Sequence, residues 1–130
     1  MDRTTIIFMV LIAAMFVGAM FFNTPKKYRL RGCSGKDWKK EYPKSPSDEI
    51  RVFLNTFVDA FAFDRKHNLN FEPSDMLMDI YRELYPSEWL PDSLELETFS
   101  EDILEQYGVS LEEIWHDKLT LGEVFERVSA

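Results

Sequence analysis

The chain has 130 residues, 45% of them hydrophobic, a length that allows one small domain with an appendage but no second core. Residues 1–46 hold nine basic and three acidic residues, a net charge of +6, whereas residues 47–130 hold six and twenty, a net charge of −14. So acidic a domain repels phosphates and attracts basic protein surfaces, which argues against a nucleic-acid partner. The single cysteine, Cys33, excludes an intramolecular disulfide framework and a CxxC metal or redox motif.

A long apolar segment opens the chain. Residues 6–22 contain no charged or strongly polar side chain, and with their flanks they reach the roughly 20 residues that cross a bilayer. We therefore expect a transmembrane anchor over residues 1–24, with residues 5–22 in the lipid bilayer. The alternative is a cleaved signal peptide, because Val17-Gly18-Ala19 is similar to a cleavage site, and the domain would then be exported.

Seven basic residues follow this segment within residues 26–40, and a single arginine precedes it. The positive-inside rule then predicts a single-pass protein of the inner or plasma membrane whose carboxyl-terminal domain is cytoplasmic. Proline, glycine and serine residues within residues 25–46 are typical of a linker, so this segment is predicted to be a basic juxtamembrane tether. Cys33, within this tether, is expected to be a free thiol, with acylation as the alternative.

Hydrophobic periodicity predicts an all-α domain over residues 47–130. The clearest pattern is an amphipathic helix that begins near Ser47 and buries the stripe Ile50, Phe53, Leu54, Phe57, Val58 and Phe61. A polar connection follows, and then residues 76–85 predict a short helix capped by Ser74 and ended by Pro86. Because this connection is long for a compact helix pair, it suggests a local helix or a functional loop.

The second strong helix begins near Asp92, which forms a D-x-x-E capping box with Glu95, and Gly108 ends it. Its apolar stripe is Leu96, Phe99, Ile103 and Tyr107. The opposite face carries the acids Glu95, Glu97, Glu101, Asp102 and Glu105. That face must be solvated or meet a basic surface. Two more capping boxes, which begin at Ser110 and Thr120, predict a short helix and a last helix.

The order of these helices, with Asp92-Ser93-Leu94 at the start of the acidic one and LTLGEVFERV at the end, resembles the acyl carrier protein family. The resemblance covers roughly residues 47–129. It implies an all-α, acyl-carrier-like bundle of three main helices plus short helices, here expected to follow the single transmembrane helix. It also implies a protein without catalytic residues, because a carrier presents its cargo to enzymes and needs no general base or nucleophile.

In that family the serine that matches Ser93 carries a 4'-phosphopantetheine arm, whose thiol holds an acyl group as a thioester. Unpaired N–H groups in the first turn of a helix would favour the added phosphodiester. The resemblance further implies docking on basic-surfaced enzymes or membrane proteins through Asp92, Leu94, Glu95, Glu97, Glu101 and Asp102. The alternative is an unmodified carrier-like adaptor, in which Ser93 only begins the helix and the acids bind a basic cytoplasmic or membrane protein.

Other residue patterns carry less chemistry. His67 and His116 are far apart in sequence, and neither pairs with Cys33 at a ligand spacing, so no metal site is expected. Carboxylate pairs on one helix face, such as Glu101 with Glu105, are typical of solvated surface. The aromatic stripe of the first helix is expected to be core, and the acidic domain to be monomeric.

Overall fold

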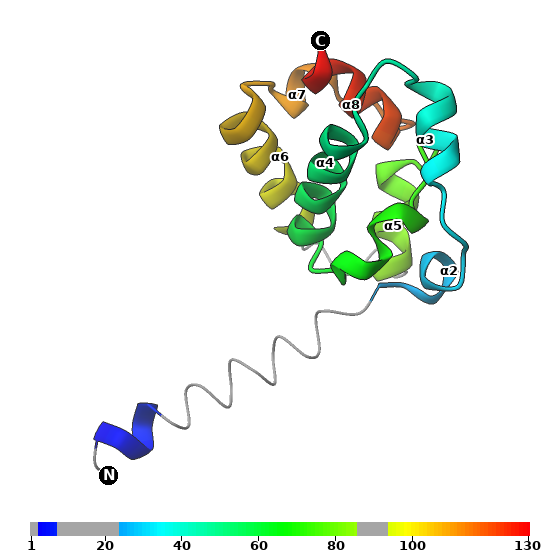
Figure 1. Cartoon of the computed structure of the whole chain (residues 1–130). Coiled ribbons are helices and arrows are strands. Elements are labelled where there is room, and N and C mark those ends of the chain that lie inside the picture. Colours follow the sequence, from blue (N-terminus) through cyan, green and yellow to red (C-terminus); the bar gives the residue numbers. More distant parts are fainter. Residues whose placement is uncertain (1–2, 8–23, 86–93) are drawn as a thin grey trace.

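The structure, a computed structural model, describes residues 3–7, 24–85 and 94–130 (Figure 1). These residues form helices and turns, and none of them belongs to a β-strand; Met76 and Thr120 form one isolated antiparallel bridge. The all-α class expected for residues 47–130 is therefore confirmed for the part of this range that the structure describes. Residues 86–93, which include Asp92 and Ser93, lie outside the described residues.

Helix α4 (Ser47–Ala60) lies at the centre of the domain, with α6 (Leu94–Tyr107) along one side of it (Figure 1). The short α7 (Leu111–Ile114) and then α8 (Leu121–Ser129) follow α6. Gly108, which follows α6, has a φ of +70°, a backbone conformation that glycine adopts without a Cβ clash, so the predicted stop of this helix is confirmed. Ser47 is the first residue of α4 and Pro46 is its N-cap, one position earlier than expected.

Large aromatic rings fill the core. The predicted stripe of α4 is confirmed, since Phe53, Phe57 and Phe61 each expose 2% or less of their surface. Phe99 of α6 packs against them, with its ring centroid 5.6 Å from that of Phe57. Rings of this size bury much apolar area per residue, which lets a small domain without disulfides stay folded.

The long polar connection after α4 contains a local 3₁₀ helix, η1 (Arg65–Asn70), and helix α5 (Leu77–Leu84) follows it. The side chain of Asp64 accepts the backbone N–H of Lys66 and caps η1. Helix α5 begins at Met76 as N-cap, so the cap predicted at Ser74 is wrong. The sequence suggested either a local helix or a functional loop in this connection, and the structure shows a local helix.

The start of α5 is joined to the start of α8 by backbone hydrogen bonds. The N–H of Leu77 donates to the carbonyl of Leu119, and the N–H of Leu121 donates to the carbonyl of Asp75, each over 2.9 Å. Thr120 between them caps α8, with its Oγ1 accepting the N–H of Glu123 at 3.2 Å, as the capping box predicted. These bonds hold the two helix starts together although they are more than 40 residues apart in sequence.

Residues 25–46, expected to be a tether, are instead part of the folded domain. They form α2 (Lys26–Arg29) and α3 (Gly35–Glu41), and Tyr28 and Trp38 in them are almost completely buried. Arg31 between the two helices reaches the α5 region, where its Nη1 lies 2.6 Å from the carboxylate of Asp75. The prediction of a tether is therefore wrong for this segment, because its two large aromatic side chains belong to the core.

The membrane-spanning helix is the second correction. No helix of the described residues is long and apolar enough to cross a membrane. The longest of them, α4 and α6, have 14 residues each, about 21 Å of helix against roughly 30 Å of hydrocarbon. In the expected anchor only residues 3–7 are described as helix before Thr24; residues 8–23, where most of that prediction fell, lie outside the described residues. Within the described residues, the finding contradicts the prediction of a single-pass membrane protein with a cytoplasmic domain.

Candidate functional site

Helix α6 begins at Leu94, the residue that follows Ser93. Ser93 and Asp92, the expected attachment residue and its neighbour, lie outside the described residues, so the site is built from α6 and the helices beside it. Leu94 exposes 58% of its surface at the first position of the helix. An apolar side chain this exposed at a helix start agrees with a contact surface, although single exposed leucines are also common on proteins.

The orientation of α6 follows from two buried residues, Phe99 and Ile103, which are both fully enclosed. They lie four residues apart, and therefore on one face of the helix. Leu96 and Tyr107, expected in the same stripe, pack against the edge of the core and are only partly buried. The buried stripe of α6 is thus narrower than predicted, and Leu96 is left at the boundary between core and surface.

The acids of α6 do not form one continuous surface. Glu97 and Glu101 are exposed and line a groove between α6 and α7. Asp102 and Glu105 line a different cleft, next to Thr56 and Asp59 of α4. Four of the five acids that the sequence places on one face therefore divide between two clefts on different sides of the helix.

Glu95 faces neither of these clefts. The hydroxyl of Tyr85, at the end of α5, donates a hydrogen bond to its Oε1. Its Oε2 is buried and has no hydrogen-bond partner among the described residues. Glu95 thus ties α6 to the end of α5.

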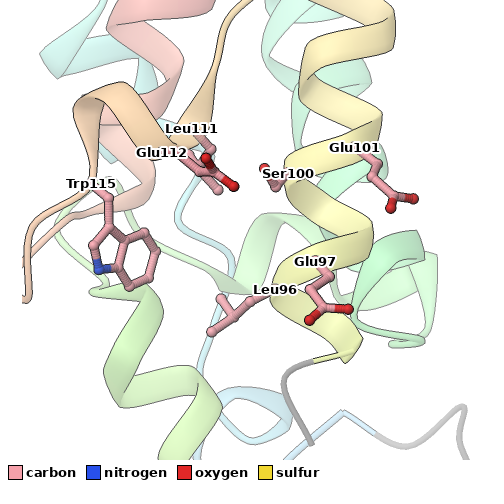
Figure 2. Close-up of a pocket in the computed structure, with 7 residues that line it drawn as sticks. All are labelled: Leu96, Glu97, Ser100, Glu101, Leu111, Glu112 and Trp115. Atoms are coloured by element: carbon pink, nitrogen blue, oxygen red, sulfur yellow. The ribbon is translucent and has the colours of Figure 1, made fainter.

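The groove between α6 and α7 has a volume of about 450 Å³, within the usual range for binding pockets. Leu96, Leu111 and Trp115 supply its apolar surface, and Figure 2 shows Leu96 and Trp115 on opposite sides of it. The lining is completed by one hydroxyl and three carboxylates, from Ser100, Glu97, Glu101 and Glu112. The arrangement is an apolar slot with an acidic rim, which suits a ligand that is apolar at its centre and positively charged around it.

Trp115 is the residue that sequence reasoning missed. It follows α7 directly and exposes 37% of its surface, whereas Trp38 in the core exposes none. The local sequence carried only a weak signal, a tryptophan placed between Ile114 and the polar run His116-Asp117-Lys118. Its place on the groove depends on how α7 packs beside α6, which no local pattern reports.

The histidines and the cysteine are apart from this groove. His67 Nδ1 lies 3.0 Å from the hydroxyl of Thr24, and His116 Nε2 lies 2.6 Å from the carboxylate of Glu123. Cys33 is a free, exposed thiol. Across residues 3–7, 24–85 and 94–130, no three His, Cys, Asp or Glu side chains converge as metal ligands would.

Comparison with known proteins adds no relative: no protein-family model, curated protein or solved structure matches this chain. The acyl carrier protein resemblance therefore rests on the residues and the helix order alone.

Proposed function

We propose that this protein is a non-catalytic, acyl-carrier-like protein. Ser93 carries a 4'-phosphopantetheine arm with an acyl thioester, and the acids of α6 dock on enzymes with basic surfaces. The observation that carries the proposal is the pairing of Glu97 and Glu101, both exposed, on a helix that begins one residue after Ser93. The succession of α4, α6, α7 and α8 supports it, because it follows the order of helices in a carrier.

In this proposal the protein itself catalyses no chemical step. The arm supplies the thiol that holds the acyl group, so this chain contributes only the serine oxygen of a phosphodiester and a surface that partner enzymes recognise. Docking through carboxylates agrees with the net charge of −14 over residues 47–130, which attracts basic surfaces over a distance set by ionic strength. The chain departs from the family at Pro91, where acyl carriers usually have a glycine.

Intact-mass measurement tests the attachment. The purified chain is incubated with coenzyme A and a broad-specificity phosphopantetheinyl transferase, and we expect a gain equal to one 4'-phosphopantetheine group. Ser93→Ala should abolish the gain, and Ser110→Ala, a serine before the next helix, should retain it. Pro91→Gly should accelerate it, because glycine relieves the restriction that proline places on the backbone. If no heavier species forms in the wild type or in Pro91→Gly, the carrier proposal is wrong.

A second candidate is an unmodified adaptor that binds a basic protein partner. The observation that favours it is the groove between α6 and α7, where Trp115 and the exposed Glu97 and Glu101 offer a contact surface that needs no attached arm. For an adaptor, Ser93→Ala leaves partner binding unchanged, whereas the double variant Glu97→Lys/Glu101→Lys abolishes it. Loss of binding in Ser93→Ala alone would contradict the adaptor and return the function to the attached arm.

A further inference from the structure

We infer that the groove between α6 and α7 binds one amphipathic, basic α-helix of a protein partner, with Trp115 as its main apolar contact. This inference rests on the docking part of the proposed function and not on modification of Ser93. It is drawn from the groove lined by Leu96, Leu111, Trp115, Ser100 and three glutamates (Figure 2).

The first step is the apolar surface. Leu111 is buried and forms part of the core, Leu96 is partly buried, and Trp115 is exposed by 37%. Apolar surface therefore continues from the core out to an aromatic ring that still contacts water. A partner side chain placed here would be covered by protein on several sides, which is the setting in which tryptophan contributes most to binding.

The second step is the charge. Glu97, Glu101 and Glu112 are the charged residues of the lining, and no basic side chain of the described residues lines this groove. An anionic ligand would meet three carboxylates at close range, and a wholly apolar one would displace water from them and replace none of its hydrogen bonds. A lysine- or arginine-bearing ligand removes both penalties and gains long-range attraction to the acidic domain.

The third step is the form of the partner. The described residues present no β-strand edge for an extended peptide to join. A groove between two helices instead accepts a third helix, which places apolar side chains at i, i+3, i+4 and i+7 along the floor and basic ones toward the rim. The partner is therefore a helical segment with one apolar stripe and basic flanks.

A second copy of the chain is the competing occupant. Its basic helix α3 buries its apolar residue, Trp38, and so has no apolar side chain of that size to insert. Helix α2 likewise buries Tyr28, and the exposed apolar residue beside it is Leu30, which is 70% exposed. One leucine after a single helical turn covers far less of the groove than an apolar stripe does, so a partner protein is the better occupant.

The test uses the full chain and a fluorescein-labelled peptide of about 18 residues, with leucines on one helical face and lysines on the other. Fluorescence anisotropy at about 0.15 M salt should show saturable binding that weakens as salt is raised. A peptide with glutamate in place of lysine should not bind. Absence of saturable binding by the lysine peptide overturns the inference.

Single substitutions test whether the peptide binds in the groove. Trp115→Ala should weaken binding by about 30-fold or more, as expected for a buried aromatic contact. Glu101→Lys should weaken it by about tenfold or more. The matched control is Glu105→Lys, the same charge change one turn along α6 in the other cleft, with an effect of less than about threefold. Circular dichroism and thermal unfolding verify that each variant is folded.

A second measurement guards against nonspecific attraction. In ¹H–¹⁵N spectra, the indole signal of Trp115 should shift on peptide addition, whereas that of the buried Trp38 should not. If Glu101→Lys and Glu105→Lys weaken binding equally and the Trp115 signal does not shift, the attraction is only to the acidic domain and the groove inference fails.

A further variant tests a second copy of the chain as the occupant. Leu30→Asp must leave peptide binding and sedimentation unchanged. A monomer–dimer equilibrium that this change removes would assign the groove to a second copy. Attachment at Ser93, measured by mass, is unaffected by either result.

Discussion

The indole Nε1 of Trp38 donates a buried hydrogen bond of 2.8 Å to the backbone carbonyl of Phe71. This bond joins α3 to the segment after η1, 33 residues away in sequence. The indole ring also packs edge-on against Phe125 of α8, with centroids 5.7 Å apart. One side chain of the presumed tether thus connects three parts of the core.

Replacing Trp38 should destabilise the domain strongly. Trp38→Ala is expected to lower the free energy of unfolding by about 3–5 kcal/mol, because it removes a fully buried ring. Trp38→Phe keeps most of the ring but leaves the Phe71 carbonyl without its donor, at a cost of about 1–3 kcal/mol. Urea unfolding followed by circular dichroism measures both. Leu30→Ala, at a 70% exposed position, should change stability by less than about 0.5 kcal/mol.

Shortening the chain tests residues 24–46 as a unit. A chain that begins at Thr24 keeps Tyr28 and Trp38 and should unfold cooperatively. A chain that begins at Ser47 loses both and exposes the rings that they contact, which are Phe53 and Phe125 at Trp38 and Phe71 at Tyr28. We expect the shorter chain to lack a cooperative thermal transition. Equal unfolding midpoints for the two chains would mean that residues 24–46 act as a tether after all.

Gly122 in α8 allows a close approach of three segments. A Cβ at this position would lie 2.7 Å from the hydroxyl of Tyr42 and 2.9 Å from the backbone carbonyl of Pro73. Because the second contact is with backbone, Gly122→Ala should cost about 1–3 kcal/mol of stability, measured by denaturant unfolding. The control is Gly32→Ala, where a Cβ meets nothing within 4 Å. Equal stability of the two variants would contradict the close packing.

The caps of α8 and α7 differ in a measurable way. Thr120 Oγ1 accepts the N–H of Glu123, whereas the side chain of Ser110, the N-cap of α7, makes no capping hydrogen bond. Thr120→Ala should therefore lower stability by about 1 kcal/mol, and Ser110→Ala by much less. Thermal unfolding of the two variants compares them directly. A larger loss for Ser110→Ala would show that the cap assignment is reversed.

High pH should destabilise the domain through Tyr28. Burial raises the pKa of Tyr28 well above its ordinary value, and the negative charges of Asp75 and Glu83 raise it further. The folded state therefore keeps the phenol proton that the unfolded state loses above pH about 10. The contribution of Tyr28 is fully present below that pH and falls above it, by up to about 1.4 kcal/mol per pH unit.

Urea unfolding between pH 8 and about 11.5 measures this loss, the range being set by the ordinary tyrosine pKa. Tyr28→Phe keeps the ring stacked on Phe71 and removes the titrating group, so its stability should fall less steeply above pH about 10. Tyr42 and Tyr107 also have raised pKa values, chiefly through burial, and they contribute in both proteins. The quantity to compare is therefore the difference in unfolding free energy between the wild type and Tyr28→Phe at each pH. Parallel curves would rule out Tyr28 as the source.

Local sequence patterns determined where most of the helices lie. The spacing of Phe53, Phe57 and Phe61 predicted both α4 and its buried face. Apolar residues four positions apart lie on the same face of a helix, and that face packs against the core. The cap at Thr120 and the stop at Gly108 were equally local, since a side chain within three residues or a single φ angle decides each of them. The acidic residues of α6 could also be identified directly from the sequence.

Tertiary structure decided which side chains of the basic segment enter the core and which acids of α6 share a surface. Tyr28 and Trp38 lie among lysines, prolines and glycines, and they are buried only because Phe71 and Phe125 reach them from distant parts of the chain. Glu97 and Glu101 line one groove together with Trp115, whereas Asp102 lines the cleft on the α4 side, because the packing of α6 fixes its rotation. Helical periodicity reports the faces of one helix, and the neighbour that covers each face depends on contacts between residues far apart in the chain.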